Sequence, residues 1–152
     1  MRVVVQRVSS ASVTIAGRIA GRIDRGLLVL VGIETADTAA DGEWLAQKLV
    51  KLRIFDDPEG HVHLSVADIS GGILVISQFT LHASTQKGTR PSFTAAARPE
   101  HAEPLYRQFV AQLTAALDRP VQTGEFGAMM SVALVNDGPV TLILDSKTKN
   151  SP

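Results

Sequence analysis

The chain of 152 residues contains no cysteine, which excludes disulfides, thiolate metal sites and a cysteine nucleophile. Aromatic residues are also scarce, at 5% of the chain, so a core must be built mainly from aliphatic side chains. The N-terminal apolar run, residues 3–5, is too short for a secretory signal. No segment approaches the ~20 apolar residues that span a bilayer. We therefore expect a cytoplasmic protein with no membrane contact, and the lack of cysteine suits that reducing compartment.

Net charge is absent as well, because 15 basic residues balance 15 acidic ones. This neutrality argues against a nonspecific coat for nucleic acids. Acidic residues are missing from one window, Ile69 to Pro99, which nevertheless contains Lys87, Arg90 and Arg98. A local positive field in this window would suit an anionic substrate. A short window can also lack acidic residues by chance or because it belongs to the core.

The first part of the chain is predicted to be rich in strands, followed by one helix. An unbroken apolar run at residues 27–31 indicates a central strand buried on both faces. Thr38 is a typical helix N-cap, and Asp41 follows three residues later as in a capping box. Leu45, Leu49 and Leu52 then recur at the spacing of one helix face. Other extended segments are expected at residues 2–8, from residue 13, around Ile19 and Ile23, and at 61–64 after a turn at 56–60.

The second part alternates strands with another helix. Residues 73–76 indicate a buried strand, and residues 83–98 form a loop long enough to be functional or disordered. A helix that starts near Pro104 carries an apolar stripe. Two strands, 129–135 and 140–144, are separated by a turn, and residues 146–152 are expected to fray. The stripe consists of Leu105, Phe109, Leu113 and Leu117.

These elements predict one α+β domain over residues 1–152, with two amphipathic helices on a barrel-like sheet. Three polar residues, Ser77, Gln78 and Thr80, end the buried strand without a Gly or Pro that would explain a turn. Buried polar groups cost about 1–3 kcal/mol each unless they are paired. The pattern suggests a site at the strand end, but a strand that passes from core to surface explains it equally well.

Several catalytic chemistries find little support. His61 and His63 would face the same side of a strand, but zinc usually takes a third protein ligand and neither histidine adjoins a carboxylate cluster, so we favour a structural role. No phosphate-binding glycine motif occurs. Ser77 lacks the flanking glycines of a nucleophile elbow. Thr80 would need a base to become a nucleophile, and the sequence does not identify a residue for that role.

Gly138–Pro139 is a hairpin turn by its composition. About 5–6% of X–Pro bonds in folded proteins are cis. A cis bond here would reorient two consecutive carbonyl oxygens outside the sheet pairing. Such a pair of acceptors could bind an ammonium group.

Two of these stretches together resemble the signatures of the D-aminoacyl-tRNA deacylase family, also called D-tyrosyl-tRNA deacylases. The resemblance covers nearly the whole chain. It rests on Ser77-Gln78-Phe79-Thr80-Leu81 and on Asn136-Asp137-Gly138-Pro139-Val140-Thr141. Further similar segments are Gln6-Arg7-Val8, Leu52-Arg53-Ile54-Phe55, Lys87-Gly88, Arg90-Pro91-Ser92-Phe93 and Asp145-Ser146-Lys147.

The resemblance implies a layered β/β/α fold and a homodimer that hydrolyses the ester of D-aminoacyl-tRNA, and of glycine mischarged on alanine tRNA. Phe79 and Thr80 would supply oxyanion-hole amides, with Ser77 and Gln78 in the same catalytic stretch. A cis Gly138–Pro139 from the partner subunit would hold the substrate ammonium and exclude L side chains. Arg7 would orient that motif, and Asn136 would belong to the same substrate-binding group. Neither metal nor cofactor is implied, and Lys87 and Arg90 are candidate RNA contacts.

Departures from the family pattern are small, and none of them lies in either signature. His82 stands where the family more often has Tyr, and Gln86 and Thr89 replace residues that are often Arg. Two alternatives stay open at this point. One is a noncatalytic RNA-binding module that uses the basic loop, and the other is a general esterase with Thr80 as nucleophile.

Overall fold

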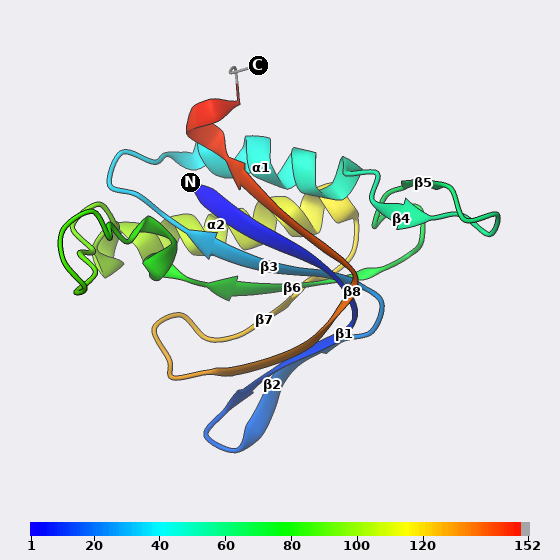
Figure 1. Ribbon diagram of the computed structural model, residues 1–152, viewed down its shortest axis with the longest axis horizontal. Coiled ribbons are helices and arrows are strands. Elements are labelled where there is room, and N and C mark those ends of the chain that lie inside the picture. The colour runs from blue at the N-terminus through cyan, green and yellow to red at the C-terminus, as the bar shows by residue number, and fades with distance from the viewer. Residues whose placement is uncertain (150–152) are drawn as a thin grey trace.

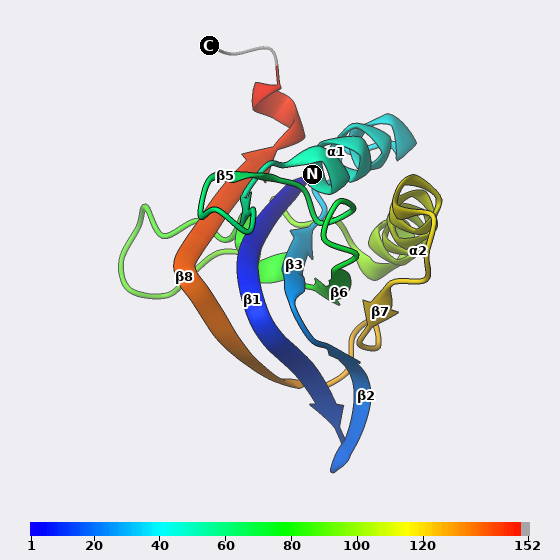
Figure 2. The same cartoon turned by 90° about the vertical axis from the view of Figure 1, so that its right-hand side faces the viewer.

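The computed structural model describes residues 1–149 as a strongly curled sheet covered on one face by two helices (Figure 1). The main sheet has the order β2-β1-β3-β6-β7, and β8 pairs with the other edge of β1. Figure 2 shows how the curl makes the sheet barrel-like, and β2 also contacts β7 across the opening. The prediction of an α+β fold with a barrel-like sheet and two helices is therefore confirmed. Its strands are β1 (Arg2–Ile15), β2 (Arg18–Ile23), β3 (Gly26–Gly32), β6 (Gly72–Ser77), β7 (Gln122–Thr123) and β8 (Ser131–Asp145).

The first strand is longer than expected. We predicted two strands at its ends, but Arg2–Ile15 run as one strand of 14 residues. Its first half pairs with β3 and its second half with β2, while β8 follows both halves. Shifts in register between Gln6 and Ser10 let this strand bend, so it crosses Ser9 and Ser10 without ending.

The central strand is β3, as the apolar run predicts. It lies between β1 and the parallel strand β6, and only Leu30 of its residues is not fully buried. Side chains on one face of the sheet pack against the helices, including Val29 and Val75. Side chains on the other face, including Leu28 and Leu74, fill the inside of the curl. The alternation of side chains along each strand thus creates two cores.

Helix α1 (Ala39–Lys51) begins where the capping box predicts. Thr38 N donates to Asp41 Oδ2 at 2.8 Å, and Leu45 and Leu49 are fully buried. A second, small sheet follows it, formed by β4 (Phe55–Asp56) and β5 (Val62–Leu64).

Helix α2 (Pro99–Leu117) begins five residues before the predicted start at Pro104. Pro99 occupies the first helical turn, where a missing N–H costs nothing. Pro104 is exposed inside the helix. The buried stripe includes Ala102 and Tyr106 in addition to Phe109, Leu113 and Leu117.

The Gly138–Pro139 segment does not form the predicted hairpin turn. Strand β8 continues through it and stays antiparallel to β1 on both sides. Gln6 pairs with Thr141 and Val8 with Asn136, so four residues of β8 lie opposite Arg7 alone. The segment 137–140 is therefore a wide bulge that projects from a continuous strand.

The predicted frayed tail is only partly described. Ser146–Thr148 form a short 3-10 helix, η2, and Ser146 is buried. Ser146 N donates to Met1 O at 2.9 Å, and Asp145 Oδ1 accepts from Lys147 N at 3.0 Å, which orders this turn. Residues 150–152 of the expected tail lie outside the described residues. Neither helix of residues 1–149 has the length and apolar character needed to cross a membrane.

Candidate active site

The polar residues after β6 lead into a 3-10 turn, η1 (Phe79–His82). Gln78 N donates to Val31 O at 2.7 Å, which ties the start of this turn to the end of β3. Gly32 lies directly beneath the turn. A Cβ at Gly32 would lie 2.9 Å from Leu81 Cβ and 3.0 Å from Gln78 O, so glycine is needed for this close approach.

Two backbone amides of this turn are free donors. Within residues 1–149, no hydrogen bond uses the N–H of Phe79 or of Thr80, whereas Leu81 N donates to Gln78 O at 3.2 Å. The first N–H groups of any helical turn lack an intrahelical acceptor, so both can bind an external oxygen. The Thr80 hydroxyl is held beside them, because its Oγ1 accepts from Gln78 Nε2 at 2.5 Å.

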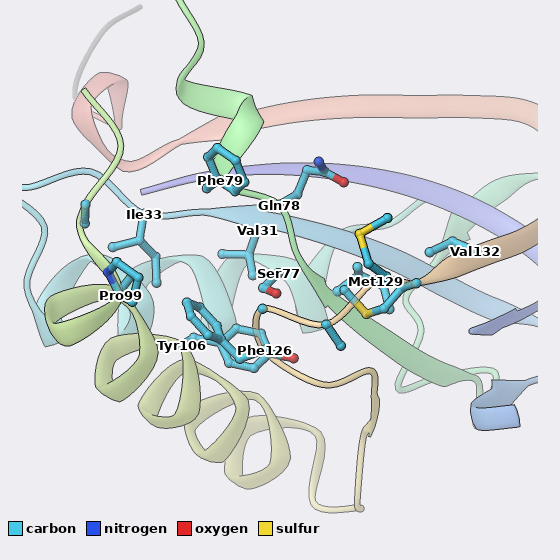
Figure 3. Close-up of a pocket in the computed structure, with 16 residues that line it drawn as sticks. Val31, Ile33, Ser77, Gln78, Phe79, Pro99, Tyr106, Phe126, Met129 and Val132 are labelled. Carbon is cyan, nitrogen blue, oxygen red and sulfur yellow. The ribbon is translucent and has the colours of Figure 1, made fainter. Parts of the chain in front are cut away.

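A cavity of about 450 Å³ opens beside this turn (Figure 3). Ser77, Gln78 and Phe79 line it from β6 and η1, and Figure 3 shows Tyr106 and Phe126 on the opposite side of Ser77. The rest of its wall is aliphatic or contains sulfur. These residues are Val31, Ile33, Ile76, Ala97, Pro99, Ala102, Gly127, Ala128, Met129, Met130 and Val132.

Among residues 1–149, no acid or base of ordinary strength lines the cavity. Tyr106 is the only ionisable side chain in this lining, which is drawn entirely from residues 1–149. Burial raises the pKa of Tyr106 to about 12, and its hydroxyl lies 3.4 Å from Val75 O. Tyr106 therefore stays neutral near pH 7 and cannot act as a general base there. The donors near the cavity are the side chains of Ser77 and Gln78 and the free amides of η1, of which Phe79 lines the cavity and Thr80 is the next residue along the chain.

The bulge of β8 is held from behind by Arg7. Arg7 Nε donates to Asp137 O at 3.1 Å, and Arg7 Nη1 donates to Ile54 O at 2.7 Å. The Gly138–Pro139 peptide bond is cis, and both residues are exposed. The Arg7 side chain is almost fully buried, so its two hydrogen bonds fix the base of the bulge. The tip of the bulge, at Gly138 and Pro139, is exposed.

Asn136 anchors the bulge from the strand itself. Its amide fits the surroundings with the nitrogen facing the carbonyl oxygens of Arg7 and Val140, both at 3.1 Å. Its oxygen then accepts from Gln6 Nε2 at 3.3 Å and from Thr141 Oγ1 at 3.1 Å. All four contacts are within the chain, so Asn136 holds the shape of the bulge.

One chain does not bring the two predicted signatures together. No residue of 136–141 lines the cavity beside η1. Arg7 pairs with Leu27 of β3, whereas Ser77 pairs with Val31, four residues or roughly 13 Å further along that strand. Phe79 and Thr80 therefore lie at one end of the sheet, and the bulge lies well away from them along β1.

A family model described as D-Tyr-tRNA(Tyr) deacylase matches residues 4–145. The chain belongs to this family. It is therefore an enzyme of the ester hydrolase class, as the resemblance predicts. A D-aminoacyl-tRNA deacylase of Opitutus terrae is 62% identical over 149 residues, which are 98% of this chain and 99% of that protein. One from Chloroflexus aurantiacus is 59% identical over 152 residues, or all of this chain and 94% of that protein.

Two solved structures resemble the fold of this family member. One, described as a c-Myc DNA unwinding element binding protein, has a TM-score of 0.89 and 42% identity, and the match covers 95% of this chain and 98% of that one. The other is described as a probable eukaryotic D-amino acid tRNA deacylase. It has a TM-score of 0.82 at 19% identity over the same shares of the two chains, which shows the fold alone.

The far wall of the cavity was not predicted from the sequence. Tyr106 carries the chain's only phenol and is buried on α2, but it is not part of the apolar stripe that the sequence predicts. Phe126 packs against it with ring centroids 5.7 Å apart. Met129, which is 92% exposed, was assigned to a strand but precedes β8. An exposed large apolar residue becomes visible as a signal only once burial is known.

The histidine prediction was wrong in one respect. His63 Nε2 lies 2.7 Å from Asp57 Oδ2, and His61 Nδ1 lies 3.6 Å from Asp57 and 3.7 Å from Glu59, so both adjoin carboxylates in the turn between β4 and β5. Asp57, Glu59 and His61 could offer three metal ligands at this exposed turn.

A second group of possible metal ligands contains Glu34, Asp37 and His82. Asp37 Oδ1 lies 2.5 Å from the α-amino group of Met1, and Glu34 forms an ion pair with Lys147. Cationic groups of the chain therefore already neutralise these carboxylates.

Proposed function

We propose that the protein hydrolyses the ester of D-aminoacyl-tRNA, and of glycyl-tRNA mischarged on alanine tRNA, as a cytoplasmic homodimer. The observation that carries this proposal is a cavity without an effective acid or base, beside two free backbone amides at Phe79 and Thr80. Such a site stabilises a developing oxyanion but supplies no nucleophile of its own. It suits a labile ester whose own groups complete the chemistry.

In the proposed reaction the ester carbonyl oxygen binds the amides of Phe79 and Thr80. Water attacks the carbonyl carbon, and the substrate's ribose 2′-OH relays the water proton to the departing 3′-oxygen. The C–O ester bond breaks, releasing the amino acid and a free 3′-hydroxyl. One oxyanion-hole donor is worth about 2.7–4 kcal/mol in other enzymes, so two can account for much of the rate.

The apolar cavity would hold the terminal adenosine of the tRNA. Its volume of about 450 Å³ is in the range of small-molecule sites, about 300–1,000 Å³. Tyr106 and Phe126 offer aromatic surface for a base, and Gln78 and Ser77 offer hydrogen-bonding groups toward the ribose.

Selection of the D form would come from a second subunit. The bulge at Gly138–Pro139 is exposed and lies far from η1 in the same chain, which supports a site to which a partner subunit would supply it. Its carbonyl oxygens would accept hydrogen bonds from the substrate's α-ammonium group, while the bulk of Pro139 would collide with an L side chain. Arg7 and Asn136 would keep the bulge in this orientation.

The loop after η1 would contact the tRNA backbone. Ser84 and Ser92 exchange two backbone hydrogen bonds, of 2.7 and 2.9 Å, and so close a projecting loop around Lys87 and Arg90. Both cations are exposed and form no ion pair within residues 1–149. Neutralising either should weaken tRNA binding and reduce its dependence on salt.

The deciding experiment compares hydrolysis of D-tyrosyl-tRNA, L-tyrosyl-tRNA and glycyl-tRNA(Ala) by the purified protein. We expect turnover of the first and third and none of the second. Equal rates on the D and L forms, or no turnover of the D form, would contradict the proposal. tRNA binding without turnover that persists in Gly138→Ala would favour a noncatalytic binding module instead.

A substrate that ends in 2′-deoxyadenosine tests the proton relay. Loss of turnover with this substrate is expected from substrate assistance. Normal turnover with it, combined with a trapped acyl-enzyme that Thr80→Ala abolishes, would favour an esterase that uses Thr80 as nucleophile.

A further inference from the structure

A second cavity, of about 540 Å³, lies on the other side of the segment that borders the first one. Ala97 and Pro99 line the first cavity, whereas Ala96 and Arg98 line the second. Ala97 N donates to Ile33 O at 2.9 Å, and Ala96 pairs with Glu34, so this segment is tied to the end of β3. Adjacent residues therefore face adjacent cavities, and the segment forms a fixed ridge between them.

Two exposed aromatic rings extend this ridge. Phe79 lines the first cavity and Phe93 lines the second. Their ring centroids are 5.2 Å apart with an interplanar angle of 71°, and the residues are 57% and 41% exposed. The faces of exposed aromatic rings are the usual stacking surfaces for bases of a single strand. Here the second ring has no counterpart in the proposed binding of the terminal adenosine.

The polar groups of the second cavity match a nucleotide. Arg98 and Glu100 form no ion pair within residues 1–149, and Thr35 forms no side-chain hydrogen bond there. A guanidinium can donate to a phosphate or to the ring acceptors of a pyrimidine, and a carboxylate can accept from the amino group of cytosine. The lining is Thr35, Phe93, Thr94, Ala96, Arg98, Glu100 and His101.

We propose that this cavity binds the cytidine that precedes the terminal adenosine of the tRNA, with its base against Phe93 and with Arg98 and Glu100 at its polar edge. The assignment rests on the proposed function, because it assumes that the terminal adenosine occupies the first cavity. The enzyme would then hold two consecutive nucleotides across one ridge. The acceptor end would thereby be held through its last two nucleotides, both on the ribose side of the scissile ester.

The test measures binding, so that it does not depend on turnover. Calorimetry compares 3′-amide-linked D-tyrosyl-adenosine, which cannot be hydrolysed as an ester, with the same analogue extended by a 5′ cytidine and by a 5′ abasic nucleotide. We expect the cytidine analogue to bind about tenfold more tightly than the mononucleoside analogue. The abasic analogue should bind no more than about twofold more tightly than the mononucleoside analogue, since the base makes the stacking contact.

Variants assign the gain to the second cavity. Phe93→Ala should reduce the affinity gain of the cytidine analogue to about twofold. Phe93→Tyr keeps the aromatic face and should retain the full gain. Arg98→Ala should lower this affinity gain severalfold. Arg22 is an exposed arginine on β2, and Arg22→Ala should leave the gain unchanged.

The two proposals fail in different ways. Equal binding of the mononucleoside and cytidine analogues, no binding of the cytidine analogue, or an equal loss for both analogues in Phe93→Ala overturns the cytidine site. Absence of D-tyrosyl-tRNA turnover with the binding gain intact overturns the proposed reaction but supports the cytidine site. A full gain with the abasic analogue would show a phosphate contact and overturn the base assignment.

Discussion

Gly138 has a backbone conformation that an L side chain rarely adopts, with φ at +119°. A Cβ there would also lie 2.6 Å from Arg7 Nη2 and 3.3 Å from Val140 N. We predict that Gly138→Ala lowers the free energy of unfolding by more than about 1 kcal/mol, because alanine is strained at this φ. It should lower kcat/KM for D-tyrosyl-tRNA at least tenfold, because a shift of about 1 Å in a positioning group can cost up to about 100-fold.

A matched variant separates strain from function. Gly60 has φ at +86°, and a Cβ there meets nothing within 4 Å. Gly60→Ala should therefore destabilise the protein without reducing kcat/KM beyond twofold. Denaturant unfolding and initial rates on both variants provide the check, and equal effects of the two on the rate would contradict the role of the bulge.

Arg7 combines two hydrogen bonds to backbone carbonyl oxygens with ion pairs to Asp56 and Asp137. Its Nε and Nη1 bind carbonyl oxygens of Asp137 and Ile54, and a lysine ammonium cannot reproduce both bonds in this geometry. Arg7→Lys should cost about 1–3 kcal/mol of stability, the range for a buried polar group left unpaired. It should also narrow the ratio of D- to L-tyrosyl-tRNA hydrolysis, which a purely structural loss would leave unchanged.

At the scale of elements, the start of α1 depends on one carboxylate. Burial alone would raise the pKa of Asp41, but the hydrogen bond from the Thr38 backbone and further favourable contacts outweigh it and lower the pKa below 3.8. The ionised group therefore stabilises the folded state above that ordinary pKa. This contribution is lost as the pH falls through the lower pKa of the folded state.

Asp41→Ala should accordingly cost about 0.5–2 kcal/mol at pH 7, as other helix caps do. The difference from the unsubstituted protein should shrink when unfolding is measured at decreasing pH below about 4. Glu43→Ala is the control on the same helix and should cost about 0.2–0.5 kcal/mol, since within residues 1–149 the Glu43 side chain hydrogen-bonds only with Gln47, one turn on. A constant difference between pH 7 and pH 3 would exclude the carboxylate as its source.

At the scale of the molecule, β8 presents a surface that one chain does not cover. None of its 15 residues is fully buried, and its second edge has no partner within residues 1–149. Val135 is 57% and Ile143 is 70% exposed. A long edge strand with exposed apolar side chains tends to pair with another chain, which agrees with the proposed homodimer.

Ile143→Glu should therefore shift the protein toward monomer and lower deacylation in parallel, because each site would lose the bulge of its partner. Sedimentation velocity and rates at several protein concentrations provide the measurement. Ile19→Glu is the matched control, as Ile19 is 51% exposed on β2. A monomeric Ile143→Glu that keeps full activity would contradict a site shared between subunits.

Local patterns decided much of this architecture. The apolar run at 27–31 predicted the central strand, and Thr38 with Asp41 predicted where α1 begins, because an unbroken apolar run and a capping pair are both visible in neighbouring residues. The two signatures, at 77–81 and 136–141, were sufficient to indicate the family and the ester hydrolase class.

Tertiary structure decided what those patterns left open. Asn136–Pro139 has the composition of a turn, but long-range pairing with β1 and the fork of Arg7 make it a bulge in a continuous strand. Tyr106 and Phe126 became a cavity wall only because α2 and the segment before β8 meet there. Local sequence patterns thus predicted the central strand, the start of α1, the apolar stripe of α2 and the family. The meeting of distant segments, which no local pattern encodes, decided the shape of the cavity and the distance between its free amides and the bulge.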